Sequence, residues 1–288
     1  AMDLPDQAAR AAIGMAVLLF GSCRYRHVIE IGNEILETQP DRLEPATHVQ
    51  LRLMLGIARY YLGDFRPSLE QLQIAIELDD EVNCTQANPF SGADPAIVAR
   101  DYASFSARYL GFGRNSDAWC EESVQIAQAR GHAFSIAWAK HFLARALRYD
   151  GCYRESIVAA DEAISICEKN GLPVMMGNAL RARGISRFHL GQHEQGLREV
   201  QRGLSIQRKT CNILGLTLRI SELVEMQVCA NQADEASASL CEAEHISEIT
   251  DEKYSLAEIS RLRGRIWHLR GNFESARTCY ERAIAQAK

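Results

Sequence analysis

The sequence predicts an all-α protein in which about seven antiparallel helix pairs stack into one right-handed superhelical solenoid over residues 1–288. Three observations support this fold class. A turn residue recurs about every forty residues, and small residues recur at fixed distances from it. The composition, with 47% hydrophobic residues, 24% charged residues and only seven prolines, also suits a helical protein.

The turn residues are glycines, with one asparagine. They are Gly63, Gly111, Gly151, Gly191, Asn231 and Gly271. The first step is 48 residues and each later step is 40 residues. Glycine and asparagine tolerate the left-handed backbone conformation that ends many helices. A period of this length indicates stacked supersecondary units.

Small residues occupy three fixed places around each turn residue. Seven residues before it stand Gly56, Ser104, Ala144, Gly184, Val224 and Gly264. Five residues after it stand Ser68, Ser116, Ser156, Gly196, Ala236 and Ala276. Twelve residues after it stand Ala75, Ser123, Ala163, Gly203, Ala243 and Ala283. Only Val224 breaks the series, and this pattern allows two helices to pack closely as an antiparallel hairpin.

The helix pairs are expected near residues 3–38, 43–79, 95–130, 132–169, 172–209, 212–249 and 251–287. In the first pair Val28 and Ile35 replace small residues, which suits a terminal unit that packs on one side only. The eight surplus residues of the longest step fall in a loop at 79–95. There Asp94 can cap a helix that Pro95 opens.

Composition argues against several functional classes. A formal charge of −5 disfavours nucleic-acid binding. No apolar run reaches the ~18 residues of a membrane span, and residues 11–23 lack the features of a signal peptide. The nine cysteines are odd in number and form no CxxC motif, so we expect reduced thiols in a cytoplasmic protein.

Common catalytic and cofactor motifs are missing. The chain has neither a GxxxxGK[ST] loop nor a GxSxG elbow. In GFGRNS (111–116), Ser116 stands where a dinucleotide fingerprint needs its third glycine. His189 and His193 have the spacing of metal ligands, but Gly191 interrupts the helical face between them. We therefore expect no enzymatic activity, no cofactor and no bound metal.

The period and the small-residue pattern resemble the tetratricopeptide repeat, whose usual period is about 34 residues. The resemblance implies that the first helix of each pair lines a concave groove. Carried over by register, the candidate partner-binding residues are Asp101, Phe105, Arg108, Trp138, His141, Arg145, Arg148, Asn178, Arg181, Phe188, Arg261 and Arg265. The same wall should include Tyr102, Tyr109, Phe142, Ile185, His189, Ser221, Glu222, Glu225, Glu258 and His268.

Two interpretations of this wall are open. Arginine forks bind carboxylate or phosphate and aromatic rings add apolar contact area, so the wall could bind an acidic peptide or an anionic small molecule. Alternatively, the arginines form a solvated face and pair with Asp101, Glu222 or Glu225. Self-association through the terminal repeats is also expected to be feasible, since Ala276 and Tyr280 lie near an uncovered end.

Two stretches narrow the resemblance. GADPAIVARDYASFSARYLGFGRNSDA (92–118) and RGHAFSIAWAKHFLARALRYDG (130–151) resemble the helical-repeat region of bacterial class III adenylate/guanylate cyclases joined to an AAA-type ATPase. Similar arrays follow the ATPase in winged-helix and LuxR-type regulators. Ala133 and Asn115-Ser116 depart from the family's Pro and Pro-Asp. The resemblance implies a non-catalytic protein-interaction and sensor scaffold for signal transduction, or alternatively a small-molecule effector receptor of a transcriptional regulator.

Overall fold

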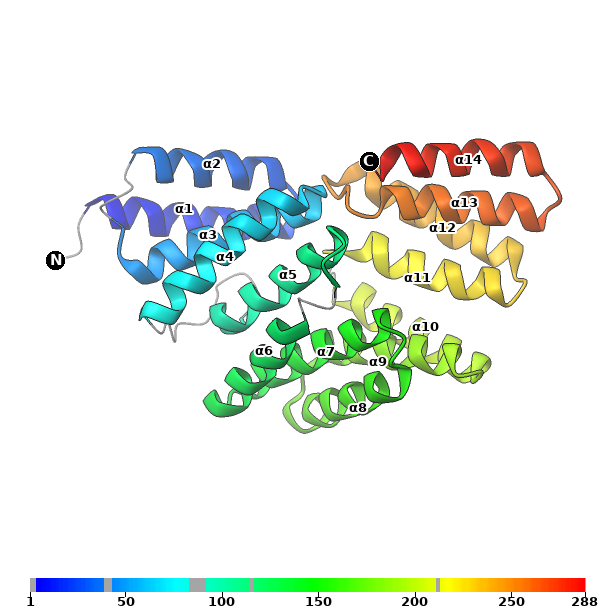
Figure 1. The fold of residues 1–288 in the computed structure, drawn as a ribbon, viewed down its shortest axis with the longest axis horizontal. Coiled ribbons are helices and arrows are strands. Elements are labelled where there is room, and N and C mark those ends of the chain that lie inside the picture. Colours follow the sequence, from blue (N-terminus) through cyan, green and yellow to red (C-terminus); the bar gives the residue numbers. More distant parts are fainter. Residues whose placement is uncertain (1–3, 39–42, 83–91, 114–116, 211–212, 288) are drawn as a thin grey trace.

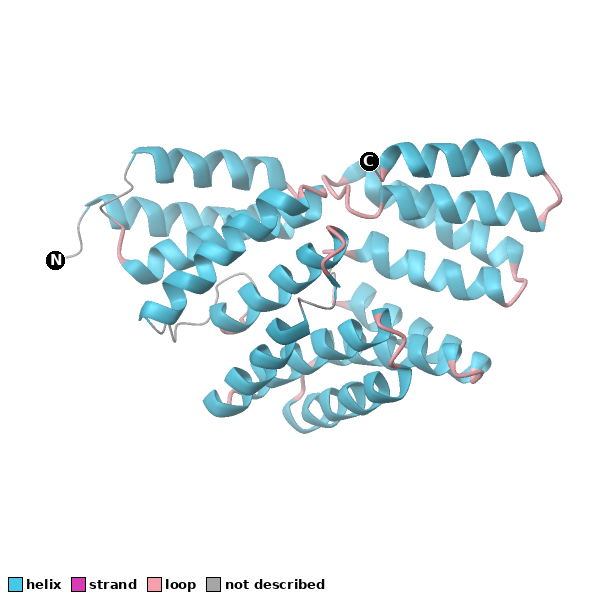
Figure 2. Cartoon of the chain, in the orientation of Figure 1, coloured by secondary structure: helices cyan, strands magenta, loops and turns pink. Residues whose placement is uncertain are grey.

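The computed structural model describes residues 4–38, 43–82, 92–113, 117–210 and 213–287. In this part of the chain every regular element is a helix, and the helices follow one another as seven pairs (Figure 2). The helices are α1 (Leu4–Gly21), α2 (Tyr25–Thr38), α3 (Pro45–Leu62), α4 (Phe65–Val82), α5 (Pro95–Tyr109), α6 (Asp117–Arg130), α7 (Ala133–Tyr149), α8 (Tyr153–Asn170), α9 (Pro173–His189), α10 (His193–Lys209), α11 (Leu216–Cys229), α12 (Ala233–Ile249), α13 (Leu256–Leu269) and α14 (Phe273–Gln286). The predicted all-α solenoid is confirmed.

The predicted turn residues all adopt the left-handed conformation between the two helices of a pair. Gly63 has φ 85°, and Asn231, the one non-glycine residue of the series, has φ 60°. The first pair uses the same geometry at Cys23, with φ 54°, forty residues before Gly63. The repeat therefore extends to the first pair, although no glycine marks its turn.

The small residues lie where the two helices of a pair meet. Seventeen of the eighteen predicted positions are described, and all seventeen are buried. The eighteenth, Ser116, lies outside the described residues. A Cβ atom on Gly184 would lie 2.7 Å from the carbonyl oxygen of Gly196, so α9 and α10 approach closely only because these residues lack side chains.

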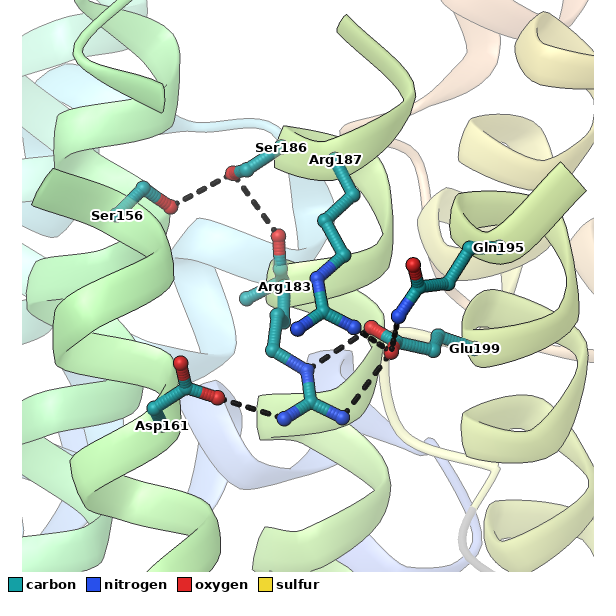
Figure 3. Close-up of polar contacts among 8 residues, drawn as sticks. Ser156, Asp161, Arg183, Ser186, Arg187, Gln195 and Glu199 are labelled. Atoms are coloured by element: carbon teal, nitrogen blue, oxygen red, sulfur yellow. Dashed lines mark hydrogen bonds and ion pairs between the residues drawn. The ribbon is translucent and has the colours of Figure 1, made fainter. Parts of the chain in front are cut away.

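Serines at equivalent places also connect neighbouring pairs. Ser156 donates a hydrogen bond to the carbonyl oxygen of Ala144 at 2.7 Å, and its Oγ lies 2.8 Å from the Oγ of Ser186 in the next pair (Figure 3). Ser68 and Ser106 form the equivalent contact, at 2.9 Å, between earlier pairs. The repeat thus conserves hydrogen bonds as well as shape within this chain.

Ion pairs add a second connection between helices α8, α9 and α10. Arg183 donates to Asp161 at 2.6 Å and to Glu199 at 2.9 Å (Figure 3). Arg187 also donates to Glu199. One glutamate on α10 therefore holds two arginines of α9.

The two ends of the solenoid contact each other through residues 250–255, which join α12 to α13 and are called the bridging segment below. Its Lys253 N–H donates to the carbonyl oxygen of Tyr61 at 2.9 Å, and Tyr25 donates to the carboxylate of Glu252 at 3.2 Å. In Figure 1 this segment lies beside the junction between α3 and α4. The first two helix pairs are therefore in direct contact with the segment that precedes the last pair.

The long loop begins later than the sequence predicts. Helix α4 continues to Val82, and residues 83–91 of the expected loop lie outside the described residues. At the loop's end Asp94 accepts a hydrogen bond from the Ala96 N–H at 3.0 Å and Pro95 opens α5, as predicted. The prediction for this helix start is confirmed.

Cysteines and apolar helices give two further observations. No disulfide joins any two of the seven described cysteines, Cys23, Cys120, Cys152, Cys167, Cys229, Cys241 and Cys279. Cys84 and Cys211 lie outside the described residues. None of the described helices combines the length and the apolar character that crossing a membrane requires.

Candidate ligand-binding cavities

Two adjacent cavities, each of about 280 Å³, lie on the inner surface. Their helical lining residues come from the first helix of each pair, so the prediction of which helices face inward is confirmed. The first, named the arginine cavity, is lined by Arg145, Arg181, Arg219, Trp138, His141 and Asn178 among others. The second, named the glutamate cavity, is lined by Glu222, Glu225, Glu258, Arg148, Tyr149 and His189 among others. Leu218 and Tyr254 line both.

Aromatic side chains form much of the wall of the arginine cavity. Trp138 and Phe142 stack with ring centroids 5.3 Å apart. Tyr254, from the bridging segment, lies 5.3 Å from the ring of Tyr60 and 5.5 Å from that of Tyr61. The contact between the two ends of the chain is therefore also a wall of this cavity.

Two arginines of this cavity have no carboxylate partner. Arg145 donates to the Tyr60 hydroxyl at 3.2 Å, and its guanidinium carbon lies 3.9 Å from the ring centroid of Phe105, a cation–π contact. Within the described ranges, no Asp or Glu forms an ion pair with Arg145 or Arg219. The Nη1 atom of Arg219 is buried and has no hydrogen-bond partner there.

Arg181, the third arginine of this cavity, pairs with a glutamate that lines the neighbouring cavity. Arg148 donates to Glu222 at 2.5 Å, and Arg181 donates to the other oxygen of the same carboxylate. Burial alone would raise the pKa of Glu222, but the guanidinium groups of Arg181, Arg148 and Arg145 lower that pKa to about 2. Burial in turn lowers the pKa of Arg181 to about 10, although Glu222 opposes that shift.

His141 lines the arginine cavity together with Arg145, Arg181 and Arg219, and is 4% exposed. Burial and the surrounding guanidinium groups lower its pKa well below the ordinary value, so the imidazole is neutral at pH 7. Those groups belong to Arg181, Arg145, Arg219 and Arg148. No aspartate or glutamate lines the arginine cavity among the described residues, so its lining carries a positive excess.

The arginines near the glutamate cavity, by contrast, are paired. Arg261 donates to Glu258 at 2.7 Å and also to Glu225. Arg265 donates to the other oxygen of Glu225. Three carboxylates thus meet the guanidinium groups of this region.

The structure places the predicted binding residues in three environments. Trp138, His141, Arg145, Asn178 and Arg181 line the arginine cavity, and Arg148 lines the glutamate cavity. The other six, Asp101, Phe105, Arg108, Phe188, Arg261 and Arg265, line neither of these two cavities. Arg148 and Arg181 form ion pairs with Glu222, and Arg261 and Arg265 form ion pairs with Glu225, although the pairs with Glu222 are buried and not part of a solvated face.

Packing explains why some of the six do not face the open groove. Asp101 is completely buried, and burial raises the pKa of its carboxyl group well above the ordinary value. Phe105 is buried under Arg145, and Phe188 stacks on His193 with centroids 4.6 Å apart. Arg108 binds Asp150 through two hydrogen bonds of 2.8 Å.

Sequence reasoning missed ten lining residues of the arginine cavity, among them Tyr60, Tyr61, Arg219 and Tyr254. Tyr60 and Tyr61 stand three and two residues before Gly63, so the register used for later units would have found them. Arg219 stands twelve residues before its turn residue. The other units have Leu51, Ala99, Ala139, Ala179 and Ile259 there. The signal for Arg219 was a charged residue at a repeat position that is apolar in the other units. Tyr254 lies between two helix pairs, where the repeat register gives no signal.

His189 and His193, which have the spacing of metal ligands, each contact an aromatic ring. His189 stacks on Tyr153 and His193 stacks on Phe188, each with centroids 4.6 Å apart. Over the described ranges, no group of three or more His, Cys, Asp or Glu side chains is arranged to hold a metal ion.

Comparisons with known proteins identify the fold. No protein-family model and no curated protein matches the chain. The apo form of RapI superposes with a TM-score of 0.69 at 10% identity, over 96% of this chain and 97% of that one. The Rap conjugation gene regulator of plasmid pLS20, in complex with the Phr* peptide, has a TM-score of 0.69 at 15% identity, over 94% and 71%.

A third similar structure contains a tetratricopeptide repeat sensor. It is a Signal Transduction ATPase with Numerous Domains (STAND) protein with a tetratricopeptide repeat sensor from Pyrococcus horikoshii. Its TM-score is 0.54 at 13% identity, over 97% of this chain and 42% of that one. At these identities the likeness shows a tetratricopeptide-like helical-repeat fold.

Proposed function

We propose that the protein is a non-catalytic regulatory scaffold that binds a peptide segment of a partner in the two inner cavities. The observation that carries this proposal is a pair of arginines, the buried Arg145 and the partly buried Arg219, that line a cavity and have no carboxylate ion-pair partner among the described residues. Leaving charges unpaired in a buried site is costly for stability alone, so a binding role accounts for them better. The structural neighbour in complex with the Phr* peptide supports a peptide as the ligand.

The signalling context is part of the same proposal. The sequence resemblance to repeat regions of cyclase and ATPase regulators and the neighbouring STAND protein both support a sensor array attached to a signalling domain. Binding would act by favouring one curvature of the solenoid over another, which requires different affinities for the two shapes. A cytoplasmic location and the absence of nucleic-acid partners belong to this proposal as predictions.

Peptide selection tests the proposal. A random peptide library is selected on the full chain and, in parallel, on Arg145→Met. Arg198→Met serves as the matched control, because Arg198 has an exposed side chain on α10. We expect peptides that bind the wild type and the control but not Arg145→Met. Peptides that bind all three proteins equally would place binding outside the cavity and contradict the proposal.

A second candidate function is reception of a small anionic effector. The grouping of Trp138 and Arg181 in one cavity of about 280 Å³ favours it, because a discrete cavity suits a small molecule better than an open trough does. Thermal-shift measurements with anionic metabolites near their binding constants would identify such a ligand. Metabolite shifts without any selected peptide would favour this candidate over the first.

Self-association through the last repeat is a further prediction. Phe273 and Ile284 on α14 are 63% and 60% exposed, so apolar surface is available there. Light scattering on the wild type and on Ile284→Glu measures it directly. A monomer at all concentrations would contradict the prediction.

A further inference from the structure

We infer that the arginine cavity is a site for a carboxylate attached to an aromatic group about the size of one amino-acid residue. Such a group is the C-terminal residue of a peptide or a small aromatic acid. The inference rests on the proposed function in taking the inner surface as the binding site. Beyond that function, the inference specifies the chemical group that the arginine cavity binds.

The first support is the balance of charge around the cavity. Arg145 and Arg219 have no carboxylate partner in the described part of the chain, and Arg181 shares Glu222 with Arg148. Among Arg145, Arg148, Arg181 and Arg219, the ion pairs therefore involve one carboxylate, that of Glu222, while the buried carboxyl group of Glu252 interacts with Arg219 without forming an ion pair. Buried charges of one sign repel each other strongly in a low-dielectric site, so an anion bound between them is favoured.

The second support is the set of unused hydrogen-bond groups on the lining residues. Three buried guanidinium nitrogens of the lining residues have no hydrogen-bond partner in the described part of the chain: Arg145 Nε, Arg181 Nε and Arg219 Nη1. Guanidinium nitrogens donate and never accept hydrogen bonds. A complementary ligand therefore supplies acceptors, and a carboxylate supplies them in the fork geometry that arginine prefers.

The third support is the shape and character of the remaining wall. Trp138, Phe142 and Tyr102 offer ring surface, and Met175 and Val174 offer apolar contact beside them. A volume of about 280 Å³ limits the ligand to a small group. The apolar wall favours a singly charged carboxylate over a phosphate, which carries more charge and loses more hydration on entry.

One side chain is already oriented for such a ligand. Gln207 donates to Asn178 Oδ1 at 2.5 Å, so this oxygen is occupied and the Asn178 NH₂ group is the part left for a ligand. The neutral imidazole of His141 adds a buried Nδ1 without a partner. These groups can bind the amide oxygen that precedes the carboxylate in an acylated amino acid.

Isothermal titration with the full chain tests the inference. The probes are N-acetylphenylalanine and its amide, the tetrapeptide Ala-Ala-Ala-Phe with a free C-terminus and with a C-terminal amide, and phenyl phosphate. We expect each acid to bind at least about tenfold more tightly than its amide, a factor that corresponds to one charge-assisted hydrogen bond. Arg145→Met and Arg219→Met should remove this preference, and Arg198→Met should keep it.

The outcomes separate this inference from the proposed function. Peptides that bind equally well as acid and amide would overturn the carboxylate site and leave peptide binding intact. N-acetylphenylalanine that binds with a strong acid preference while no peptide binds would support the site and contradict the peptide proposal. Phenyl phosphate that binds more tightly than the acid, or an absence of binding by every acid, would overturn the inference. The acid–amide comparison uses the wild type, so it holds even where a variant fails to fold.

Discussion

The arginine cavity and the glutamate cavity have the same volume and share Leu218 and Tyr254, yet their charges are balanced differently. In the glutamate cavity three carboxylates meet the nearby arginines. In the arginine cavity Arg145 and Arg219 meet none. The repeat register places arginines along both cavities, so register alone does not distinguish a structural ion pair from a free binding group.

Helix α11 creates the difference between the cavities. Its Arg219 lines one cavity, while Glu222 and Glu225, one and two turns later on the same face, line the other. A change of sign within two turns of a single helix therefore divides the inner surface into a donor-rich half and a charge-balanced half. The next experiments alter the groups that define each half.

Removal of the shared carboxylate should have the largest effect. Glu222→Gln leaves the buried side chains of Arg148 and Arg181 without their partner, so we expect the free energy of unfolding at pH 7 to fall by about 3–5 kcal/mol. Urea denaturation measures it. Glu225→Gln is the matched control, and it should lose less because its arginine partners are 30–39% exposed. Equal losses would contradict the distinction between the two cavities.

The effect of Glu222→Gln should depend on pH. The folded protein lowers the pKa of Glu222 from 4.5 to about 2. The ionised carboxylate therefore contributes stability that is complete above about pH 4.5 and is lost as the pH falls towards 2. The difference in unfolding free energy between wild type and Glu222→Gln should shrink over that window. A difference that stays constant down to pH 3 would show that Glu222 is not the group that titrates.

Loss of the shared wall should rank second. Tyr254→Ala removes ring contacts with Tyr60 and Tyr61, and we expect a loss of about 2–3 kcal/mol in unfolding free energy, less than for a fully buried aromatic residue. Phe273→Ala, at a side chain 63% exposed, is the control and should cost less than about 1 kcal/mol. Indistinguishable urea midpoints for the two variants would exclude a structural role for the bridging segment.

The smallest effects should come from a matched pair of arginines. Arg148→Met removes one partner of Glu222 and should lower the unfolding free energy by about 1–2 kcal/mol. Arg145→Met relieves repulsion among guanidinium groups but loses the contact with Phe105, so we expect a change below about 1 kcal/mol. Differential scanning fluorimetry compares the two melting temperatures. A larger loss for Arg145→Met would mean that Arg145 is a structural residue.

The sequence predicted the local packing of this fold well. The turn residues and small residues act within one helix pair, where neighbours along the chain decide the contact, and Gly184 and Gly196 meet as predicted. The bridging segment was not predicted. The contact between Tyr25 and Glu252 spans 227 residues and depends on the summed curvature of all the units between them.

The candidate site was predicted only in part, because local register does not determine contacts between units. Register gives the direction of a side chain on its own helix, which placed Trp138, Arg145 and Arg181 on the inner wall. Whether that side chain reaches open space depends on the neighbouring pair, which covers Phe105 and Asp101. An ion-pair partner on another unit, such as Glu222 for Arg181, cannot be predicted from the residue pattern of one helix.

The contact between residues 25 and 252 changes how this molecule should come apart. In an open array each terminal unit touches one neighbour, so it can fray while the rest stays folded. Here the turn of the first unit is held by hydrogen bonds from the segment that precedes the last one. A mutation that destabilises one terminal unit should therefore also destabilise the other, and we expect the whole chain to unfold in one cooperative transition.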